Sequence, residues 1–355
     1  MPMFFVFKTF NHKSLTFYPA CGRQANWLPH LDPKSIFIVF SDLPIMSNYL
    51  TKKIRREGMK KTVGFIGLGI MGKPMAKNIL KAGFSLVVFS RSKGPVEELV
   101  KEGALSADSP KGVAERSEVV ITMLPDSAEV KEVILGRNGV IQGVKGDSVV
   151  VDMSSINPLV TIEISRELKE KGVKMLDAPV SGGETGAIQG TLAIMVGGED
   201  EVFEDCFEIF KSVGRNIVHV GGIGAGEFVK LVNQIIVALN IAAVGEAFSL
   251  GVKAGIHPQV IYQAIRGGLA GSQVLETKTP MIFEGNFKPG FKIKLHLKDL
   301  NNALSTAREL GVPLPLSSFV QQIFVSLAAE GKGEEDHSAL ATFFEKMAGV
   351  EIRSF

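Results

Sequence analysis

An α/β fold, with a doubly wound and mostly parallel sheet followed by an all-α C-terminal domain, is predicted by three features of the sequence. Short apolar segments alternate with amphipathic helical patterns from Lys61 to about Gly222. A glycine-rich turn follows the first apolar segment, and only helical patterns occur after Gly224. Such alternation is typical of Rossmann-type sheets, which bind ligands beyond the carboxyl ends of their strands.

The first 58 residues form an N-terminal extension that differs from the rest of the chain. It contains the only tryptophan, Trp27, shows no sustained hydrophobic period, and ends in a basic stretch from Lys52 to Arg56. One interpretation is an organellar targeting peptide, which is basic and poor in acidic residues. We favour a start of translation at Met59, because codons for Arg55 to Gly58 can spell a purine-rich ribosome-binding sequence. We expect the extension to be disordered or loosely packed, outside the folded protein.

The first folded elements are a strand over Thr62–Ile66, a glycine turn, and a helix that ends at Gly83. The turn has the form G-x-G-x-x-G, and its residues are Gly67, Leu68, Gly69, Ile70, Met71 and Gly72. Glycines at these spacings let the backbone and the helix N-terminus approach a pyrophosphate closely. A glycine triplet alone is weak evidence, but strand, turn and helix in this order are the required context. We therefore predict a dinucleotide-binding domain over 61–222.

The second strand, Ser85–Phe89, ends about 20 residues after the glycines, where a carboxylate would bind the adenine ribose hydroxyls. The chain has Ser90, Arg91, Ser92 and Lys93 there. A hydroxyl and cations bind a 2′-phosphate, which a carboxylate would repel. The sequence therefore favours NADP(H), with NAD(H) as the alternative cofactor and a solvated basic turn as the alternative without function.

Further strands and helices complete the predicted sheet domain. Two strand ends carry candidate site residues. Met123, Leu124 and Pro125 form either a proline turn or a wall of the nicotinamide pocket, and the hydroxyls of Ser154 and Ser155 are expected to face a ligand. The strands are expected over Val119–Met123, Ser148–Val151, Lys174–Ala178, Leu192–Val196 and Ile217–Val220, and the helices over Val96–Glu102, Ala128–Leu135, Pro158–Lys171 and Glu201–Val213.

The strand over Lys174–Ala178 leads into a turn that can bind an anion. Ser181 precedes Gly182 and Gly183 in this turn. Successive backbone N–H groups beside a serine hydroxyl form a small nest that suits a carboxylate. An ordinary glycine turn is the alternative interpretation.

An all-helical substrate and oligomerisation domain is predicted over 223–355. Its first helix, Phe228–Leu250, is very apolar, but Lys230, Asn233, Gln234 and Glu246 leave no uninterrupted stretch near the ~20 residues that a bilayer requires. We therefore expect a buried central helix. Later helices are expected over Pro258–Arg266, Asp299–Leu310, Ser317–Glu330 and Ser338–Met347.

Lys230 is the residue to which we assign chemistry. Asn233 and Gln234 follow it by three and four residues, which places all three on one helix face. A lysine in a mostly buried helix is costly to desolvate, so it either finds partners or reacts. We predict that Lys230 donates a proton to a carbonyl oxygen. We expect an unperturbed pKa near ~10.4, at which lysine is protonated at neutral pH.

Composition excludes several other functions. A net charge of +2 gives no electrostatic reason for nucleic acid or a membrane surface as the main partner. Cys21 and Cys206 are too few for a disulfide framework or a zinc site, and the six histidines form no ligand pair, so we expect no metal. We expect a cytoplasmic protein with a small-molecule partner. The apolar helical region indicates a homo-oligomer, either a dimer or a tetramer.

Four motifs in this order resemble those of the β-hydroxyacid dehydrogenases, and the resemblance extends from Met59 to the C-terminus. It implies that Lys230 is the catalytic lysine, that the loop from Ser181 to Gly183 binds the substrate carboxylate, and that Ser155 lies near nicotinamide and substrate. Many relatives have asparagine at the position of Gln234, so whether Asn233 or Gln234 contacts the substrate stays open. The motifs are Gly64–Gly72, Asp177–Gly183, Gly224–Gln234 and Lys298-Asp299.

The resemblance also assigns Phe291, Lys298 and Asp299 to a helical segment that closes over the cofactor. Without it, Lys298 and Asp299 would be taken for an exposed ion pair of little energetic worth. Within the family, three stretches most resemble enzymes that reversibly reduce tartronate semialdehyde to D-glycerate. They are Ile121–Pro125, Asp152–Ile156 and, above all, Ile265–Ser272. The alternatives are a relative acting on 3-hydroxyisobutyrate, glyoxylate or succinic semialdehyde, and a non-catalytic dinucleotide-binding protein, which would have no reason to keep Lys230.

Overall fold

The computed structural model describes residues 4–6, 17–19 and 60–353. In the N-terminal extension, β1 (Phe4–Val6) pairs antiparallel with β2 (Phe17–Pro19). The expectation of a loosely packed extension otherwise falls outside the described residues. Residues 60–355 form a compact unit separate from residues 1–59, and the features below belong to this unit.

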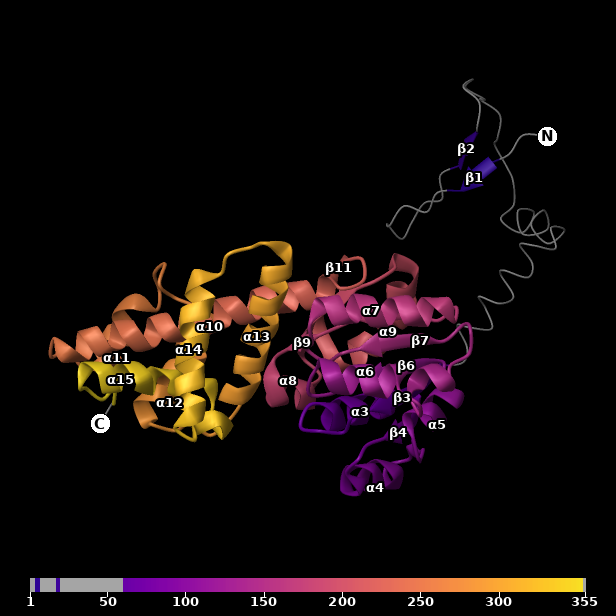
Figure 1. Cartoon of the computed structure of the whole chain (residues 1–355), viewed down its shortest axis with the longest axis horizontal. Helices are drawn as coiled ribbons and strands as arrows, with labels where there is room; N and C mark the ends of the chain where they lie inside the picture. The colour runs from indigo at the N-terminus through magenta and orange to yellow at the C-terminus, as the bar shows by residue number, and fades with distance from the viewer. Residues whose placement is uncertain (1–3, 7–16, 20–59, 354–355) are drawn as a thin grey trace, which may run out of the picture. The chain divides into compact units, whose positions relative to one another are not determined.

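A nine-stranded, mostly parallel sheet forms the first part of the unit. Figure 1 shows strands of this sheet with helices packed around them. Its order is β11-β10-β8-β7-β6-β3-β4-β5, and β9 pairs with β10 off this path. The strands from β8 to β5 along this order run parallel, whereas β10 is antiparallel to β8 and β9 and parallel to β11. The predicted fold class is therefore confirmed. The strands are β3 (Thr62–Ile66), β4 (Ser85–Phe89), β5 (Leu105–Ser106), β6 (Val119–Thr122), β7 (Val149–Asp152), β8 (Lys174–Asp177), β9 (Val180–Ser181), β10 (Leu192–Gly197) and β11 (Gly214–Gly221).

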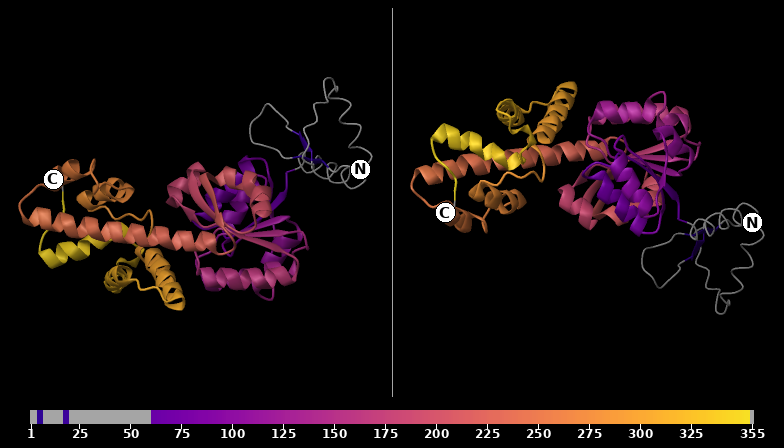
Figure 2. Two further views of the ribbon diagram at one scale, coloured as in Figure 1. Left: turned by 90° about the horizontal axis from the view of Figure 1, so that it is seen from above. Right: turned by 90° about the horizontal axis from the view of Figure 1, so that it is seen from below.

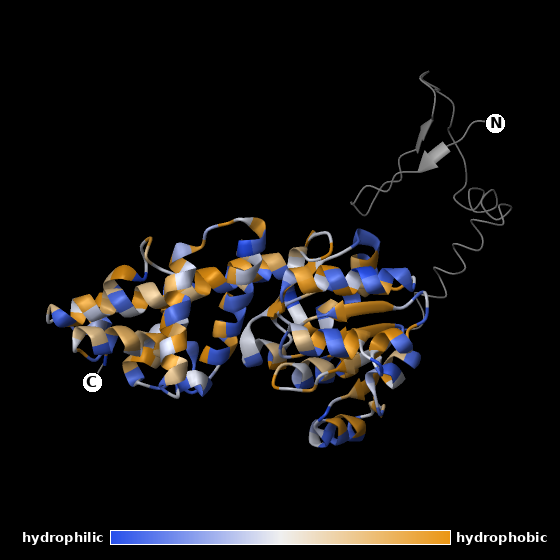
Figure 3. Ribbon diagram, viewed as in Figure 1, coloured by the Kyte–Doolittle hydropathy of each residue, from blue (hydrophilic) through white to orange (hydrophobic). Residues whose placement is uncertain are grey.

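Helices cover both faces of the sheet, so the central strands are buried on both sides (Figure 2). One core contains side chains from α3, α4, α8 and α9, and the other contains side chains from α5, α6 and α7. The strands that are visible in Figure 3 are coloured mostly as hydrophobic. The helices are α3 (Gly72–Lys81), α4 (Lys93–Lys101), α5 (Pro110–Glu115), α6 (Ser127–Leu135), α7 (Pro158–Glu170), α8 (Gly183–Gln189) and α9 (Asp200–Val213).

The order of the strands reverses at β3. The chain passes from β3 to β4 on one side and later returns to β6 on the other side of β3. In open parallel sheets, ligands bind in the crevice at such a reversal. The carboxyl ends of β3, β4, β6 and β7 therefore form the expected ligand-binding edge.

The second part of the unit is helical and is organised around α10 (Ala225–Lys253), which has 29 residues. Figure 2 shows α10 leaving the sheet as one long helix with the other C-terminal helices around it. Of the described helices, α10 alone is long and apolar enough to cross a membrane, but its buried face carries Glu227, Lys230 and Gln234. The others are α11 (Pro258–Ile265), α12 (Gln273–Glu284), α13 (Ile293–Leu310), α14 (Pro315–Ala329), η2 (Lys332–Glu334), η3 (His337–Leu340) and α15 (Ala341–Ala348).

Two expectations about the elements need correction. The first helix of the C-terminal part is not fully buried, because Val232 and Ile236 are each 55% exposed and Leu250 is 74% exposed. The elements β5, α5, β9, α8 and α12 were not predicted. Four of them are short, and α12 contains Pro280, which interrupts the helical pattern in the sequence.

Candidate active site

The glycine turn after β3 fits a dinucleotide. Gly67 has a φ of 99°, and a Cβ at this position would lie 2.3 Å from the carbonyl oxygen of Met123. A Cβ at Gly72, where α3 begins, would lie 1.9 Å from the Gly67 carbonyl oxygen. A Cβ at Gly69, by contrast, would have no atom within 4 Å. The first and last glycines are thus required by the turn, and Gly69 leaves open space where a pyrophosphate can approach the backbone.

The end of β4 lies beside this turn. The Gly67 amide donates to the Phe89 carbonyl at 3.0 Å, which places Ser90 next to the glycines. Arg91, Ser92 and Lys93 are exposed. Within the described part of the chain, no carboxylate lies within 4.0 Å of Arg91 or Lys93. Both cations are therefore free to bind a phosphate.

The serines after β7 point in different directions, which corrects one expectation. The Ser154 hydroxyl is buried, donates to Asp152 Oδ1 at 2.6 Å and accepts from the Leu124 amide at 2.9 Å. It stabilises the loops and does not face a ligand. Ser155 is half-buried, and its carbonyl accepts a hydrogen bond from Lys298.

The predicted anion nest lies between the sheet and the helical part. Ser181 pairs with Ala193 at the end of β9, and Gly182 and Gly183 have φ values of 134° and 60°. A Cβ on Gly183 would lie 3.6 Å from the Gly290 carbonyl oxygen, so this loop approaches the segment that contains Phe291. The structure therefore brings the two predicted regions together.

The N-terminus of α10 is fixed to the sheet by Asp177 at the end of β8. Asp177 Oδ1 accepts from the Gly224 amide at 2.7 Å, and Oδ2 accepts from the Glu227 amide at 2.9 Å. Burial raises the pKa of the Asp177 carboxyl to about 6, although these two amides oppose the shift. The cap determines where the first turns of α10, and hence Lys230, lie.

Lys230 is buried, with 5% of its surface exposed. Burial lowers its pKa below the usual lysine value, and the carboxylates of Asp299 and Glu227 oppose this shift. The expectation of an unperturbed lysine was therefore wrong, because the sequence did not show how completely the side chain would be desolvated. A lysine whose pKa is lowered can both donate and accept a proton closer to neutral pH.

The two amides after Lys230 form a chain that ends at Asp299. Asn233 Nδ2 donates to Gln234 Oε1 at 2.8 Å, and Gln234 Nε2 donates to Asp299 Oδ2 at 2.5 Å. The backbone carbonyl of Gln234 also accepts a hydrogen bond from His296 Nε2 at 3.0 Å. Gln234 is buried and Asn233 is half-buried, so Asn233 has more room to contact a ligand.

Lys298 joins the helical part to the ligand-binding edge of the sheet. Its ammonium donates to the carbonyl oxygens of Ser155 and of Pro125, the latter at 3.2 Å, and it pairs with Asp299 at 3.0 Å. The Lys298 and Asp299 side chains are 17% and 3% exposed. The interpretation of Lys298 and Asp299 as an exposed ion pair, which the sequence alone suggested, was therefore wrong. The two residues link Gln234 on α10 to the loops after β6 and β7.

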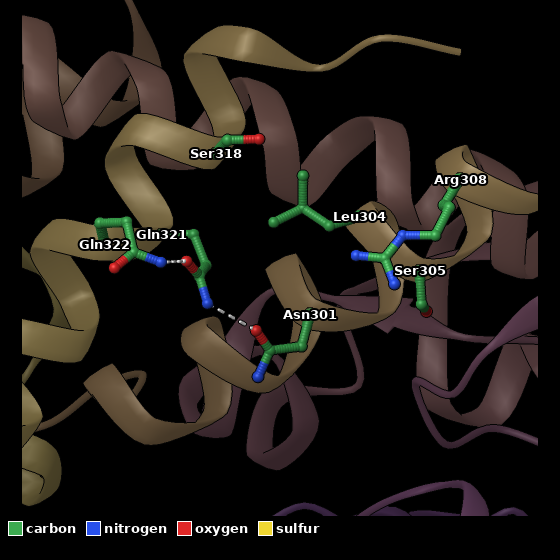
Figure 4. Close-up of a pocket in the computed structure, with 7 residues that line it drawn as sticks. All are labelled: Asn301, Leu304, Ser305, Arg308, Ser318, Gln321 and Gln322. Carbon is green, nitrogen blue, oxygen red and sulfur yellow. Dashed lines mark hydrogen bonds between the residues drawn. The ribbon is translucent and has the colours of Figure 1, made fainter. Parts of the chain in front are cut away.

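A shallow polar groove of about 370 Å³ lies between α13 and α14, away from these residues (Figure 4). It contains none of the predicted site residues. Its side chains include the amide chain from Gln322 through Gln321 to Asn301. The groove is lined by Asn301, Leu304, Ser305, Arg308, Ser318, Gln321 and Gln322.

The stretch Ile265–Ser272, the main basis for inferring the substrate, lies far from Lys230 of the same chain. It follows α11, which packs against α10 at Gly251, where a Cβ would lie 2.3 Å from Ile261 Cδ1. Gly251 is 251 − 230 = 21 residues beyond Lys230, or about 32 Å along the helix. Arg266 pairs with Glu276, and Leu269 is fully exposed.

Sequence reasoning missed the buried acids Asp152 and Glu227, and it gave no role to His296. Asp152 and Glu227 are each 0% exposed. The one signal in the sequence was the spacing of Glu227, three residues before Lys230 on the same helix.

Two sequence families match this chain. The NAD-binding domain of 6-phosphogluconate dehydrogenase matches residues 62–221, and the NAD-binding region of NADP-dependent 3-hydroxyisobutyrate dehydrogenase matches residues 224–344. Together these matches cover the sheet and most of the helical part.

This chain covers nearly the whole length of several relatives. The 2-hydroxy-3-oxopropionate reductase of Escherichia coli (strain K12) is 47% identical over 82% of this chain and 99% of its own length. The 2-(hydroxymethyl)glutarate dehydrogenase of Eubacterium barkeri is 41% identical over 82% of this chain and 97% of its own. The structure of Mycobacterium tuberculosis 3-hydroxyisobutyrate dehydrogenase with L-serine is 30% identical, with a TM-score of 0.76 over 80% of this chain and 99% of its own. The chain therefore belongs to the β-hydroxyacid dehydrogenase family and is an NAD(P)-dependent oxidoreductase that acts on the CH–OH group of short hydroxy acids.

Proposed function

We propose that this protein is a tartronate semialdehyde reductase (2-hydroxy-3-oxopropionate reductase), which reversibly reduces tartronate semialdehyde to D-glycerate. The observation that carries the proposal is the position of Lys230. It is buried at the start of α10, and the carboxyl groups of Asp299 and Glu227 oppose the lowering of its pKa. Asp299 in turn pairs with Lys298, which donates to the Ser155 carbonyl. The 47% identity to the reductase of Escherichia coli supports the choice of substrate.

The cofactor that we propose is NADP(H), which supplies the hydride when bound. Gly67, Gly69 and Gly72 would hold its pyrophosphate at the start of α3, together with the backbone of Leu68, Ile70 and Met71. Ser90, Arg91 and Ser92 would bind the 2′-phosphate, which the two free cations near this turn support. Met123, Leu124, Pro125 and Ser155 would line the nicotinamide side, and Phe291, Lys298 and Asp299 would cover it.

The chain's own residues would hold the substrate and move one proton. Ser181, Gly182 and Gly183 bind the substrate carboxylate through a hydroxyl and backbone N–H groups. Ser155, Asn233 and Gln234 orient the rest of the molecule. Lys230 gives a proton to the carbonyl oxygen as the carbon is reduced, and takes it back in the oxidation of D-glycerate.

We further propose a division at the start of α10, into a dinucleotide-binding domain over 61–222 and a helical domain over 223–355. The last strand ends at Gly221 and α10 begins at Ala225, which supports this boundary. We also propose a cytoplasmic homo-oligomer, either a dimer or a tetramer. The exposed Val229, Val232 and Ile236 recur on one face of α10, which supports subunit contact there.

A substrate panel with both cofactors tests the proposal. It contains tartronate semialdehyde, glyoxylate, succinic semialdehyde and the aldehyde acid that forms when 3-hydroxyisobutyrate is oxidised, each with NADPH and NADH. The highest kcat/KM is expected for tartronate semialdehyde with NADPH. A clear preference for another acid would reassign the substrate within the family, and a lack of turnover with every pair would contradict the proposal altogether.

A further inference from the structure

The segment 286–291, which joins α12 to α13, reaches the proposed site without forming a helix or a strand. The Gly290 carbonyl oxygen lies 3.6 Å from the position of a Cβ on Gly183, in the loop to which we assign the substrate carboxylate. The ring of Phe291 packs against the rings of His296 and His337, with centroids 5.7 and 5.4 Å away. Because the segment lacks the hydrogen bonds of a regular element, its position depends on the groups that bind it.

The Asp336 carboxylate binds the two residues of this segment that reach the site. Its Oδ2 accepts from the amide of Gly290 at 2.9 Å and from that of Phe291 at 3.0 Å. The Asp336 amide donates to the Phe287 carbonyl at 2.9 Å, and Lys292 pairs with Asp336 in an isolated antiparallel bridge. One side chain thus satisfies two adjacent amides that have no place in a helix or a sheet.

Asp336 is itself fixed by a cation from another helix. It is 0% exposed, and the Lys278 ammonium on α12 donates to Oδ1 at 2.9 Å and to Oδ2 at 3.1 Å. Oδ1 also accepts from the Ser338 amide at 3.0 Å, at the start of η3. Each of these hydrogen bonds comes from a donor, so the group binds the segment as a charged acceptor. Such hydrogen bonds are roughly twice as strong as those between neutral groups.

The next residue, His337, connects the same anchor to α10. Its amide donates to the Phe291 carbonyl at 2.8 Å, and its Nδ1 lies 2.9 Å from His296 Nδ1. Burial lowers the pKa of His296 and so favours the neutral ring. His296 Nε2 contacts the backbone carbonyl of Gln234, which can only accept, so this nitrogen carries the hydrogen and His296 Nδ1 accepts from His337. The anchor is therefore connected to the helix that carries the proposed proton donor.

We propose that Asp336 is a positioning residue that fixes Gly290 and Phe291 against the loop from Ser181 to Gly183, so that this loop binds the substrate carboxylate tightly. The inference rests on the proposed role of that loop. The carboxylate takes no part in the reaction, so its binding contributes equally to the ground state and the transition state. Loss of such binding raises KM and leaves kcat unchanged.

The test is Asp336→Leu, which has a similar size and no acceptor for the two amides. The KM for the acid should rise by about tenfold or more, because two residues must then be ordered again when the acid binds, and kcat should stay near the wild-type value. The acid is the member of the substrate panel with the highest kcat/KM, so a wrong choice of tartronate semialdehyde does not affect the comparison. A variant that only folds less well would lose kcat through its inactive fraction and keep the wild-type KM, and that result would overturn the proposal.

The control is Glu334→Gln. The Glu334 carboxylate also pairs with lysines, Lys292 at 2.8 Å and Lys294, but its side chain is 63% exposed. This variant should keep the wild-type KM, and a rise equal to that in D336L would contradict the assignment to Asp336. Should D336L not fold because Lys278 is left buried and unpaired, the double variant Lys278→Met/Asp336→Leu removes both charges and gives the same comparison.

A second readout needs no turnover. Amide hydrogen exchange of peptides that contain Gly290 and Phe291, followed by mass spectrometry, should be at least about tenfold faster in D336L because both amides lose their acceptor. Exchange over β3 should stay at the wild-type rate. Unchanged exchange at Gly290 and Phe291, or faster exchange with an unchanged KM, would overturn the proposal. If Lys230→Ala retained full turnover while exchange and KM moved in D336L, the proton-donor role would be wrong and the positioning role of Asp336 would stand.

Discussion

The seating of α10 on the sheet can be tested at Gly226, the second residue of the helix. A Cβ at Gly226 would lie 2.4 Å from the Met195 carbonyl oxygen and 2.7 Å from the Asp177 carbonyl oxygen. Real Cβ atoms essentially never come closer than 3.0 Å, so Gly226→Ala requires α10 to move by at least 3.0 − 2.4 = 0.6 Å. Both contacts are backbone atoms, which cannot rotate away.

The energetic consequence of this movement has two parts. Overpacking of this kind costs about 1–3 kcal/mol. The shift also weakens the two hydrogen bonds from the Gly224 and Glu227 amides to the Asp177 carboxyl, and hydrogen bonds to charged groups contribute about 1.5–3 kcal/mol each. After allowing about 1 kcal/mol for the better helix propensity of alanine, we expect the free energy of unfolding to fall by about 2–4 kcal/mol.

Turnover should fall as well, because Lys230 moves with the helix. A misplacement of 1 Å costs about 100-fold, so a shift of about 0.6 Å should reduce kcat by about tenfold or more. Urea unfolding followed by circular dichroism measures the first effect, and steady-state oxidation of NADPH measures the second. Gly222→Ala is the control, because a Cβ there has no atom within 4 Å. Wild-type stability and turnover in the Gly226 variant would refute this account of how α10 is seated.

Three further outcomes are expected. Arg91→Ala should raise the KM for NADPH about tenfold, the loss of one charge-assisted contact, and leave the KM for NADH unchanged in steady-state kinetics; equal losses for both cofactors would contradict the 2′-phosphate role. Lys298→Met should raise the dissociation constant of NADPH, measured by fluorescence titration, because the loops at Ser155 and Pro125 lose their shared donor; unchanged affinity would speak against that coupling. Burial lowers the pKa values of His296 and His337, so protonation favours the unfolded chain. Their contribution to stability is present above about pH 6.5 and is lost as pH falls. His337→Leu should therefore flatten the fall in the free energy of unfolding at acid pH, measured by urea unfolding at several pH values. An unaltered pH dependence would contradict this role of the buried histidines.

The elements that the sequence predicted best are those that depend on local pattern. The strand Thr62–Ile66, the glycine turn and the helix after it follow from apolar runs and from glycines whose backbone positions exclude a Cβ. The region of Ser181 to Gly183 and the position of Lys230 on a helix face were predictable for the same reason. Short elements such as α5 and α8 have too few residues to show a period, and Pro280 hides α12.

The features that the sequence could not predict arise from contacts between distant residues. Lys298 reaches the carbonyls of Ser155 and Pro125, which are 143 and 173 residues away in the chain, so its burial could not be read from its neighbours. The lowered pKa of Lys230 has the same origin, because desolvation depends on how α10 packs against the sheet and α13. The inward direction of the Ser154 hydroxyl is set by Asp152 and by the Leu124 amide from another strand end.

The most direct test of the account is the turnover of Lys230→Ala with tartronate semialdehyde and NADPH. The account predicts a fall in kcat of at least ~100-fold, the usual contribution of a positioned general acid, with unchanged affinity for NADPH. Lys253→Ala, at the far end of the same helix, should retain wild-type turnover. Near-normal turnover of the Lys230 variant would contradict the central claim that this buried ammonium supplies the proton.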